Sequence, residues 1–172
     1  MQIAAIDQVS GLERAEFVQA LEGIFEHSPW VAERAWLRRP FADIEALREA
    51  MVSVMMQASH EEQLALIRAH PELAGRAAVA GELTEASTRE QSGARLDKCS
   101  PEEFARLQAL NAQYNARFGF PFILAVRGLD RAGIIERFAE RLENSPQTEF
   151  AEALNQIARI ASLRLAERFP SA

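Results

Sequence analysis

Apolar side chains recur along this chain at intervals of three and four residues, the spacing of helices that bury one face. The runs with this spacing are residues 17–25, 30–36, 44–55, 64–69, 104–118, 130–142 and 148–169. Alternating, strand-like runs are nearly absent. The pattern predicts an all-α fold, with residues 1–172 forming a single-domain bundle of about seven to nine helices.

Capping signals mark the expected helix starts. Several serines have the Ser-x-x-Glu spacing of a capping box, in which side chain and main chain bond reciprocally. The candidates are Ser10 with Glu13, Ser59 with Glu62, Ser87 with Glu90 and Ser100 with Glu103, and Asp43 is a further N-cap. Pro71 should end the preceding helix at about Ala69, because proline disfavours helical backbone in the residue before it.

Residues 120–126, Phe-Pro-Phe-Ile-Leu-Ala-Val, are apolar but lack helical period. Gly119 should end the helix before them. A short buried strand would fit the composition, yet no other run offers a strand partner. The sequence therefore predicts a short extended apolar segment that is buried and leads into the next helix.

Composition narrows the classes of function. The chain has 172 residues, 48% of them hydrophobic, which is enough for a sizeable core. Its formal net charge of −6 argues against a nucleic-acid partner, because such binding needs a basic surface. Cys99 is the only cysteine, which excludes an internal disulfide and a thiolate metal cluster. With no signal-like start and no apolar run of membrane-spanning length, we expect a cytoplasmic protein that does not enter a membrane.

His70 is the histidine best placed for chemistry. It lies between a helix end and Pro71, where a fixed backbone can project the side chain into a cleft. Its ordinary pKa of about 6.5 suits proton transfer near neutral pH. The alternative is a histidine that caps the helix C-terminus. His27 and His60 have simpler structural explanations, and the three histidines lack the paired spacing of a zinc site.

Two further groups are candidates for ligand binding. At Ser87-Thr-Arg-Glu90-Gln91 a helix start could offer backbone N–H groups to an oxygen-rich ligand, although a plain capping box explains the same residues. Arg164 falls in the apolar stripe of the last helix, whereas Arg159 lies on the opposite side. A buried arginine requires an anion, and Glu90 or a substrate carboxylate could supply it. The alternative is a structural ion pair in the core.

Four stretches, taken together, resemble the family of 2-oxo-4-hydroxy-4-carboxy-5-ureidoimidazoline (OHCU) decarboxylases. They are His70-Pro-Glu-Leu-Ala-Gly, Ser87-Thr-Arg-Glu-Gln91, Leu110-Asn-Ala-Gln-Tyr114 running into Phe118-Gly-Phe-Pro-Phe-Ile123, and Ile160-Ala-Ser-Leu-Arg-Leu165. Each motif alone is weak, but the order and spacing of all four are specific. The resemblance spans nearly the whole chain.

The resemblance implies an all-α lyase that needs neither a cofactor nor a metal and converts the ureidoimidazoline to (S)-allantoin and CO₂ in urate degradation. It implies His70, Glu90 and Arg164 as the catalytic residues, with His70 as acid and base and Arg164 as the cationic partner. The implied substrate-binding residues are Pro71, Ser87, Glu90, Gln91, Phe122, Ile123, Leu124, Ala125 and Val126. Members of that family are often dimeric, so a homodimer is a further expectation.

Two other interpretations compete with this one. A non-catalytic helical scaffold or binding module would explain the helices equally well, with His70 as a cap and Arg164 in a core ion pair. A different enzyme on the same fold, such as a hydrolase of a related ureide, has less support, because the sequence shows no Ser-His-Asp or Cys-His pattern.

Overall fold

The computed structural model describes residues 6–75 and 81–170. Within these ranges the backbone forms nine α-helices and two 3-10 helices and contains no strand, which confirms the predicted all-α class. The chain divides into two compact units, Met1–Leu66 with Ala158–Ala172, and Ile67–Ile157. The assignment of a single domain to residues 1–172 stays a prediction.

The first unit is built from the N-terminal helices. These are α1 (Ile6–Ser10), α2 (Arg14–Ala20), α3 (Trp30–Ala35), the 3-10 helix η1 (Trp36–Arg38), α4 (Ile44–Gln57), the start of α5 (His60–Ala69) and the end of α10 (Pro146–Arg168). Asp43 caps α4 as predicted, since the Ala46 N–H donates to its Oδ1 at 2.8 Å. The Ser59–Glu62 capping box at the start of α5 also forms, with contacts of 3.1 and 3.3 Å.

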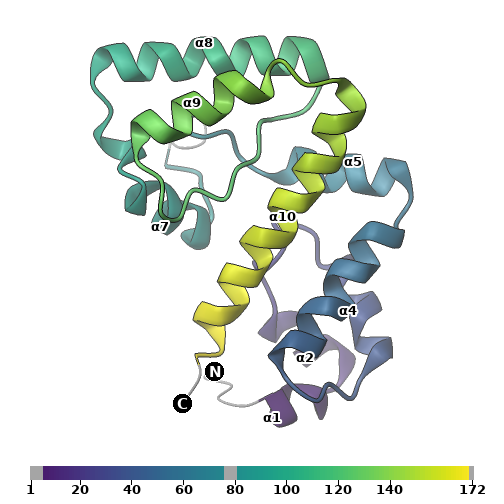
Figure 1. The fold of residues 1–172 in the computed structure, drawn as a ribbon. Coiled ribbons are helices and arrows are strands. Elements are labelled where there is room, and N and C mark those ends of the chain that lie inside the picture. The colour runs from purple at the N-terminus through teal and green to yellow at the C-terminus, as the bar shows by residue number, and fades with distance from the viewer. Residues whose placement is uncertain (1–5, 76–80, 171–172) are drawn as a thin grey trace. The chain divides into compact units, whose positions relative to one another are not determined.

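The second unit contains α7 (Glu85–Gly93), the 3-10 helix η2 (Leu96–Lys98), α8 (Pro101–Phe118), α9 (Arg131–Arg141) and the start of α10. Helices α8 and α9 lie side by side (Figure 1). Ser100 and Glu103 form the predicted capping box of α8, and Gly119 ends that helix in the left-handed conformation at φ 75°. Asp130 caps α9 by accepting from the Gly133 N–H at 2.7 Å.

Residues 120–126 carry no regular secondary structure and are buried along their whole length, as the sequence predicts. The Phe122 ring stacks on Phe138 of α9, with centroids 3.8 Å apart and planes 10° apart. The apolar contacts of the segment therefore take the place of strand pairing.

Two predicted helix starts are wrong. Ser10 is the last residue of α1, and its Oγ accepts from the distant Phe41 N–H at 3.0 Å, so Glu13 precedes α2 without a side-chain cap. Ser87 is not an N-cap either. Thr84 caps α7 by accepting from the Ser87 N–H at 3.2 Å, which places Ser87 inside the first turn. In both places the serine makes a contact other than the capping box that the Ser-x-x-Glu spacing predicts.

Smaller corrections concern the predicted apolar faces. Helix α2 ends at Ala20, before three residues that the sequence placed on it, although Leu21, Ile24 and Phe25 are buried. Phe104, on the predicted apolar face of α8, is 38% exposed. Helix α10 begins at Pro146, two residues earlier than predicted, where Ser145 Oγ accepts from the Thr148 N–H at 3.2 Å.

Candidate active site

His70 lies directly after the last residue of α5 and is buried, with 7% of its surface exposed. Its N–H donates to Ile67 O at 3.2 Å, which closes the helix, and Pro71 then directs the chain away from the helix axis. The sequence-predicted helix end is therefore confirmed. The backbone is therefore constrained on both sides of the imidazole. A group that must present a proton in one direction requires such a constraint.

The loop that follows His70, residues 71–75, is held by carboxamide side chains from α7 and α8. Gln91 of α7 accepts from the Ala74 N–H at 3.0 Å and donates to Glu72 O at 3.3 Å. Asn111 of α8 donates to Leu73 O at 3.0 Å, and Gln108 donates to Ala74 O at 2.7 Å. Side chains far along the chain thus fix the main chain of this loop.

Ser87, Glu90 and Gln91 lie on α7 at intervals of three and four residues, so they share one helix face. Ser87 and Gln91 are buried, and Glu90 is half-buried. The structure joins this helix to the His70 loop through the carboxamide of Gln91. The predicted role of that carboxamide as a substrate contact stays a prediction.

The residue just before the extended segment, Gly119, is joined to the His70 region. The Arg68 guanidinium, two residues before His70, donates twice to Gly119 O, at 3.2 and 3.1 Å. Within the segment the Ala125 N–H donates to Gln156 Oε1 at 2.9 Å. That N–H is therefore already used by the protein, and the predicted main-chain contacts to a substrate require other groups of residues 122–126.

Arg164 is buried, as the helical pattern predicts, with 5% of its surface exposed. Its Nη2 pairs with Glu26 Oε1 at 2.9 Å, and its Nη1 donates to Gly23 O at 2.8 Å. Glu26 was not among the anions suggested by the sequence. Arg164 and Glu26 belong to the first unit, whereas His70, Glu90 and the segment 122–126 belong to the second. The ion-pair interpretation is thus confirmed for this contact, and a role toward substrate stays a prediction.

The sequence analysis missed a second buried ion pair, in which Glu149 of α10 is fully buried. Its carboxylate accepts from Arg141 at 2.8 Å, from Tyr114 Oη and from Asn144 Nδ2 at 2.8 Å. Arg141 also donates to Ile123 O and lies over the Phe122 ring, so this pair holds the extended segment. The pattern that identified Arg164 would also have found Arg141, which shares a helical face with Ile134 and Phe138.

The burial of Tyr114 predicts an unusual titration. Burial, with a smaller contribution from the hydrogen bond to Glu149, raises the pKa of this phenol far above its ordinary value of 10. A raised pKa means that the unfolded chain loses the proton first, so the contribution of Tyr114 to stability falls as the pH rises above 10. Because Tyr114 is the only tyrosine, tyrosinate absorbance should appear only as the protein unfolds in base. A phenolate signal near pH 10 from folded protein would contradict the buried position. Tyr114→Phe, which has no phenol, gives the background absorbance for this measurement.

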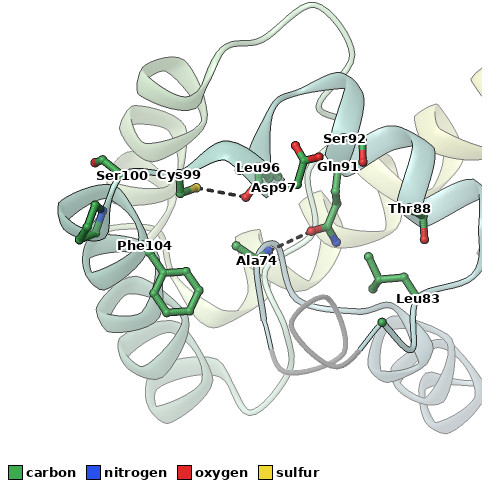
Figure 2. Close-up of a pocket in the computed structure, with 12 residues that line it drawn as sticks. Ala74, Leu83, Thr88, Gln91, Ser92, Leu96, Asp97, Cys99, Ser100 and Phe104 are labelled. Atoms are coloured by element: carbon green, nitrogen blue, oxygen red, sulfur yellow. Dashed lines mark hydrogen bonds between the residues drawn. The ribbon is translucent and has the colours of Figure 1, made fainter.

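A cavity of about 500 Å³ lies beside the loop and α7 (Figure 2). It is lined by Ala74, Gly81, Leu83, Thr88, Gln91, Ser92, Leu96, Asp97, Cys99, Ser100, Pro101 and Phe104. The Cys99 thiol donates to Leu96 O at 3.2 Å, and burial raises its pKa, so it remains protonated at neutral pH and is a poor nucleophile. Among the predicted site residues, Gln91 borders this cavity.

Neither a metal site nor a membrane span is found in the part of the chain that the structure describes. No group of three or more His, Cys, Asp or Glu side chains within residues 6–75 and 81–170 could hold a metal ion. Across the same ranges, every helix is too short or too polar to cross a bilayer.

The fold is shared with two solved proteins. A crystal structure of (S)-allantoin synthase superposes with a TM-score of 0.77 at 27% identity, covering 98% of this chain and 55% of that one. A crystal structure of OHCU decarboxylase in the presence of (S)-allantoin gives a TM-score of 0.69 at 24% identity, covering 84% of this chain and 93% of that one. The protein is therefore an all-α protein with the fold of these two structures.

Sequence comparison gives the family. Residues 10–166 match the OHCU decarboxylase family. A relative from Haloferax volcanii named 2-oxo-4-hydroxy-4-carboxy-5-ureidoimidazoline decarboxylase is 45% identical over 171 residues, which cover 99% of each chain. A relative of the same name from Mus musculus is 39% identical over 160 residues, covering 93% of this chain and 90% of its own. The chain belongs to the OHCU decarboxylase family.

Proposed function

We propose that this protein decarboxylates 2-oxo-4-hydroxy-4-carboxy-5-ureidoimidazoline to (S)-allantoin and CO₂ in urate degradation. The observation that carries the proposal is family membership over residues 10–166, in a chain that aligns with a relative of that name along 99% of both lengths. The buried His70 in a fixed His-Pro loop supports it, because the reaction needs a proton delivered to one face of a planar intermediate.

The chemistry follows from the substrate. The bond between ring carbon C4 and the carboxylate carbon breaks, CO₂ leaves, and the electron pair moves into the ring toward its C=N bond. The nitrogen of that C=N bond takes up a proton, which leaves an enol with a C4=C5 double bond. The 4-hydroxyl then becomes the carbonyl of allantoin by losing its proton, and C5 gains one. Since the ring itself accepts the electron pair, the protein need supply only orientation, electrostatic stabilisation and proton transfer.

We assign the proton transfers to His70, with Pro71 beside it. Glu90 would accept from ring or ureido N–H groups, and Ser87 and Gln91 would contact the substrate from the same face of α7. Residues 122–126 would line the site with their buried apolar side chains. Protonation from one side of C5 gives one enantiomer, so a fixed imidazole accounts for the stereochemistry of the product.

The test generates the unstable substrate from urate in situ and follows the circular dichroism of allantoin after the protein is added. We expect faster appearance of the (S) enantiomer, with no dependence on added metal and no inhibition by a chelator. Allantoin that forms at the uncatalysed rate and as a racemate would contradict the proposal and favour the non-catalytic scaffold.

We also propose that the protein acts in the cytoplasm and as a homodimer. Sedimentation equilibrium should give twice the mass of 19.2 kDa calculated for one chain. A monomer at micromolar concentration would contradict the dimer and leave the proposed reaction unaffected.

A further inference from the structure

The loop after His70 has an unusual set of main-chain contacts. Its successive carbonyls, those of Glu72, Leu73 and Ala74, each accept a hydrogen bond from a different side-chain carboxamide, at 3.3, 3.0 and 2.7 Å. The donors are Gln91, Asn111 and Gln108. Gln91 also accepts from the Ala74 N–H, as Figure 2 shows. A side chain thus fixes the main chain at each of these residues.

The loop itself has little freedom to adjust. Ala74 has a positive φ of 51°, which a residue with a Cβ rarely adopts and which the hydrogen bonds around it maintain. Gly75 packs so closely that an added Cβ would lie 2.6 Å from Glu72 Cβ. The Glu72 carboxylate in turn accepts from Asn115 Nδ2. A change at one carboxamide should therefore shift the whole loop rather than one peptide.

Helix α8 presents its donors from a rigid support. Gln108, Asn111 and Asn115 are spaced by three and four residues, so they lie on one face of the helix. The capping box at Ser100 and Gly119 at the other end fix both termini of α8. Asn111 is 3% exposed, and its Oδ1 has no hydrogen-bond partner among the residues that the structure describes. A buried acceptor without a hydrogen bond lowers stability, so Oδ1 is a cost of having asparagine at this position. The hydrogen bond that Nδ2 donates to Leu73 O offsets that cost.

We propose that Gln91, Gln108, Asn111 and Asn115 form an amide clamp, and that its α8 members are positioning residues for His70. The inference rests on the proposed function, because it assumes that the placement of the His70 imidazole limits turnover. The clamp fixes the main chain two to four residues after His70, and Pro71 restricts the link between them. A displacement of about 1 Å at a reacting group can cost 10²-fold in rate, so a clamp residue can control turnover without touching the substrate.

Kinetics provide the first test. Asn111→Ala removes the donor to Leu73 O, and we expect kcat to fall by about 10–100-fold with KM changed much less, because the loss is one of alignment. Gln113→Ala is the matched control, since it removes an exposed carboxamide from another face of α8. If Asn111→Ala fails to fold, Gln108→Ala is the second test, because Gln108 is only half-buried. We expect the same loss of kcat in that variant. Folded clamp variants with the kcat of wild type would overturn the proposal.

A second measurement does not depend on turnover. The chain has three histidines, so imidazole resonances can be followed by NMR and that of His70 assigned by its loss in His70→Ala. We expect Asn111→Ala to change the chemical shift and titration of His70 while leaving His27 and His60 as they were, and Gln113→Ala to change none of them. If the wild type shows no decarboxylation but this shift appears, the clamp stands and the proposed function fails. Unchanged His70 resonances in Asn111→Ala would overturn the clamp itself.

Discussion

His70→Asn should fold like the wild type and lose at least about 100-fold of kcat, since general acid–base catalysis typically contributes 10²–10⁴-fold. Asparagine keeps a polar side chain of similar reach, but it cannot take up and release a proton near neutral pH. The loop contacts of residues 72–74 are made by other side chains and should survive the change. The loss should therefore appear in kcat with little change in the thermal midpoint.

His60→Asn is the matched control for this experiment. His60 begins α5 and is exposed, so its replacement should leave both turnover and stability unchanged. Turnover by His70→Asn close to that of the wild type would remove His70 from the mechanism. The enantiomeric purity of the allantoin gives a further readout, because loss of the proton donor on one face should lower it.

Arg164→Met should destabilise the protein by about 3–5 kcal/mol, the usual cost of removing one partner from a buried ion pair. Glu26, its partner, is 1% exposed and would keep a buried charge without the guanidinium. The free energy of unfolding, from urea or thermal denaturation, measures this effect. Loss of activity in this variant alone could follow from instability, so it does not test the predicted substrate role.

The double variant Arg164→Met with Glu26→Leu separates the two roles. Replacing both members of a buried ion pair with apolar residues of similar size is often neutral, so stability should recover. Glu26→Leu alone should lose stability, because it leaves the buried guanidinium without its partner. If Arg164 also binds the anionic part of the substrate, the stable double variant should remain inactive. A stable and fully active double variant would reduce Arg164 to a structural residue.

Local signals in the sequence were enough for much of the fold. The caps at Asp43, Ser59 and Ser100 depend on residues within one helical turn, and all form as predicted. The two failures share a cause. Ser10 bonds with Phe41, 31 residues away, and Thr84 caps α7 one turn before the predicted position at Ser87. In each case the Ser-x-x-Glu spacing is present, but another hydrogen bond takes the place of the predicted capping box.

The candidate site was only partly predictable, because its defining contacts are distant along the chain. Helical period correctly placed Arg164 in the interior, but Glu26, 138 residues away, could not be chosen as its partner from the pattern. The same limit applies to Asn111 and Leu73, which are 38 residues apart. Asn111 stood within a motif of the sequence, yet only the folded chain shows which carbonyl it meets.

The chemical nature of the amide clamp has a consequence for how the enzyme responds to its solution. Neither a carboxamide nor a peptide group ionises at physiological pH, and neither carries the net charge that dissolved salt would screen. The contacts on Glu72 O, Leu73 O and Ala74 O should therefore keep the same geometry in acidic, neutral and saline buffers. A variation of turnover with acidity would then report protons on the reacting groups or on the Glu72 carboxylate that Asn115 contacts, and not a loss of these three main-chain bonds.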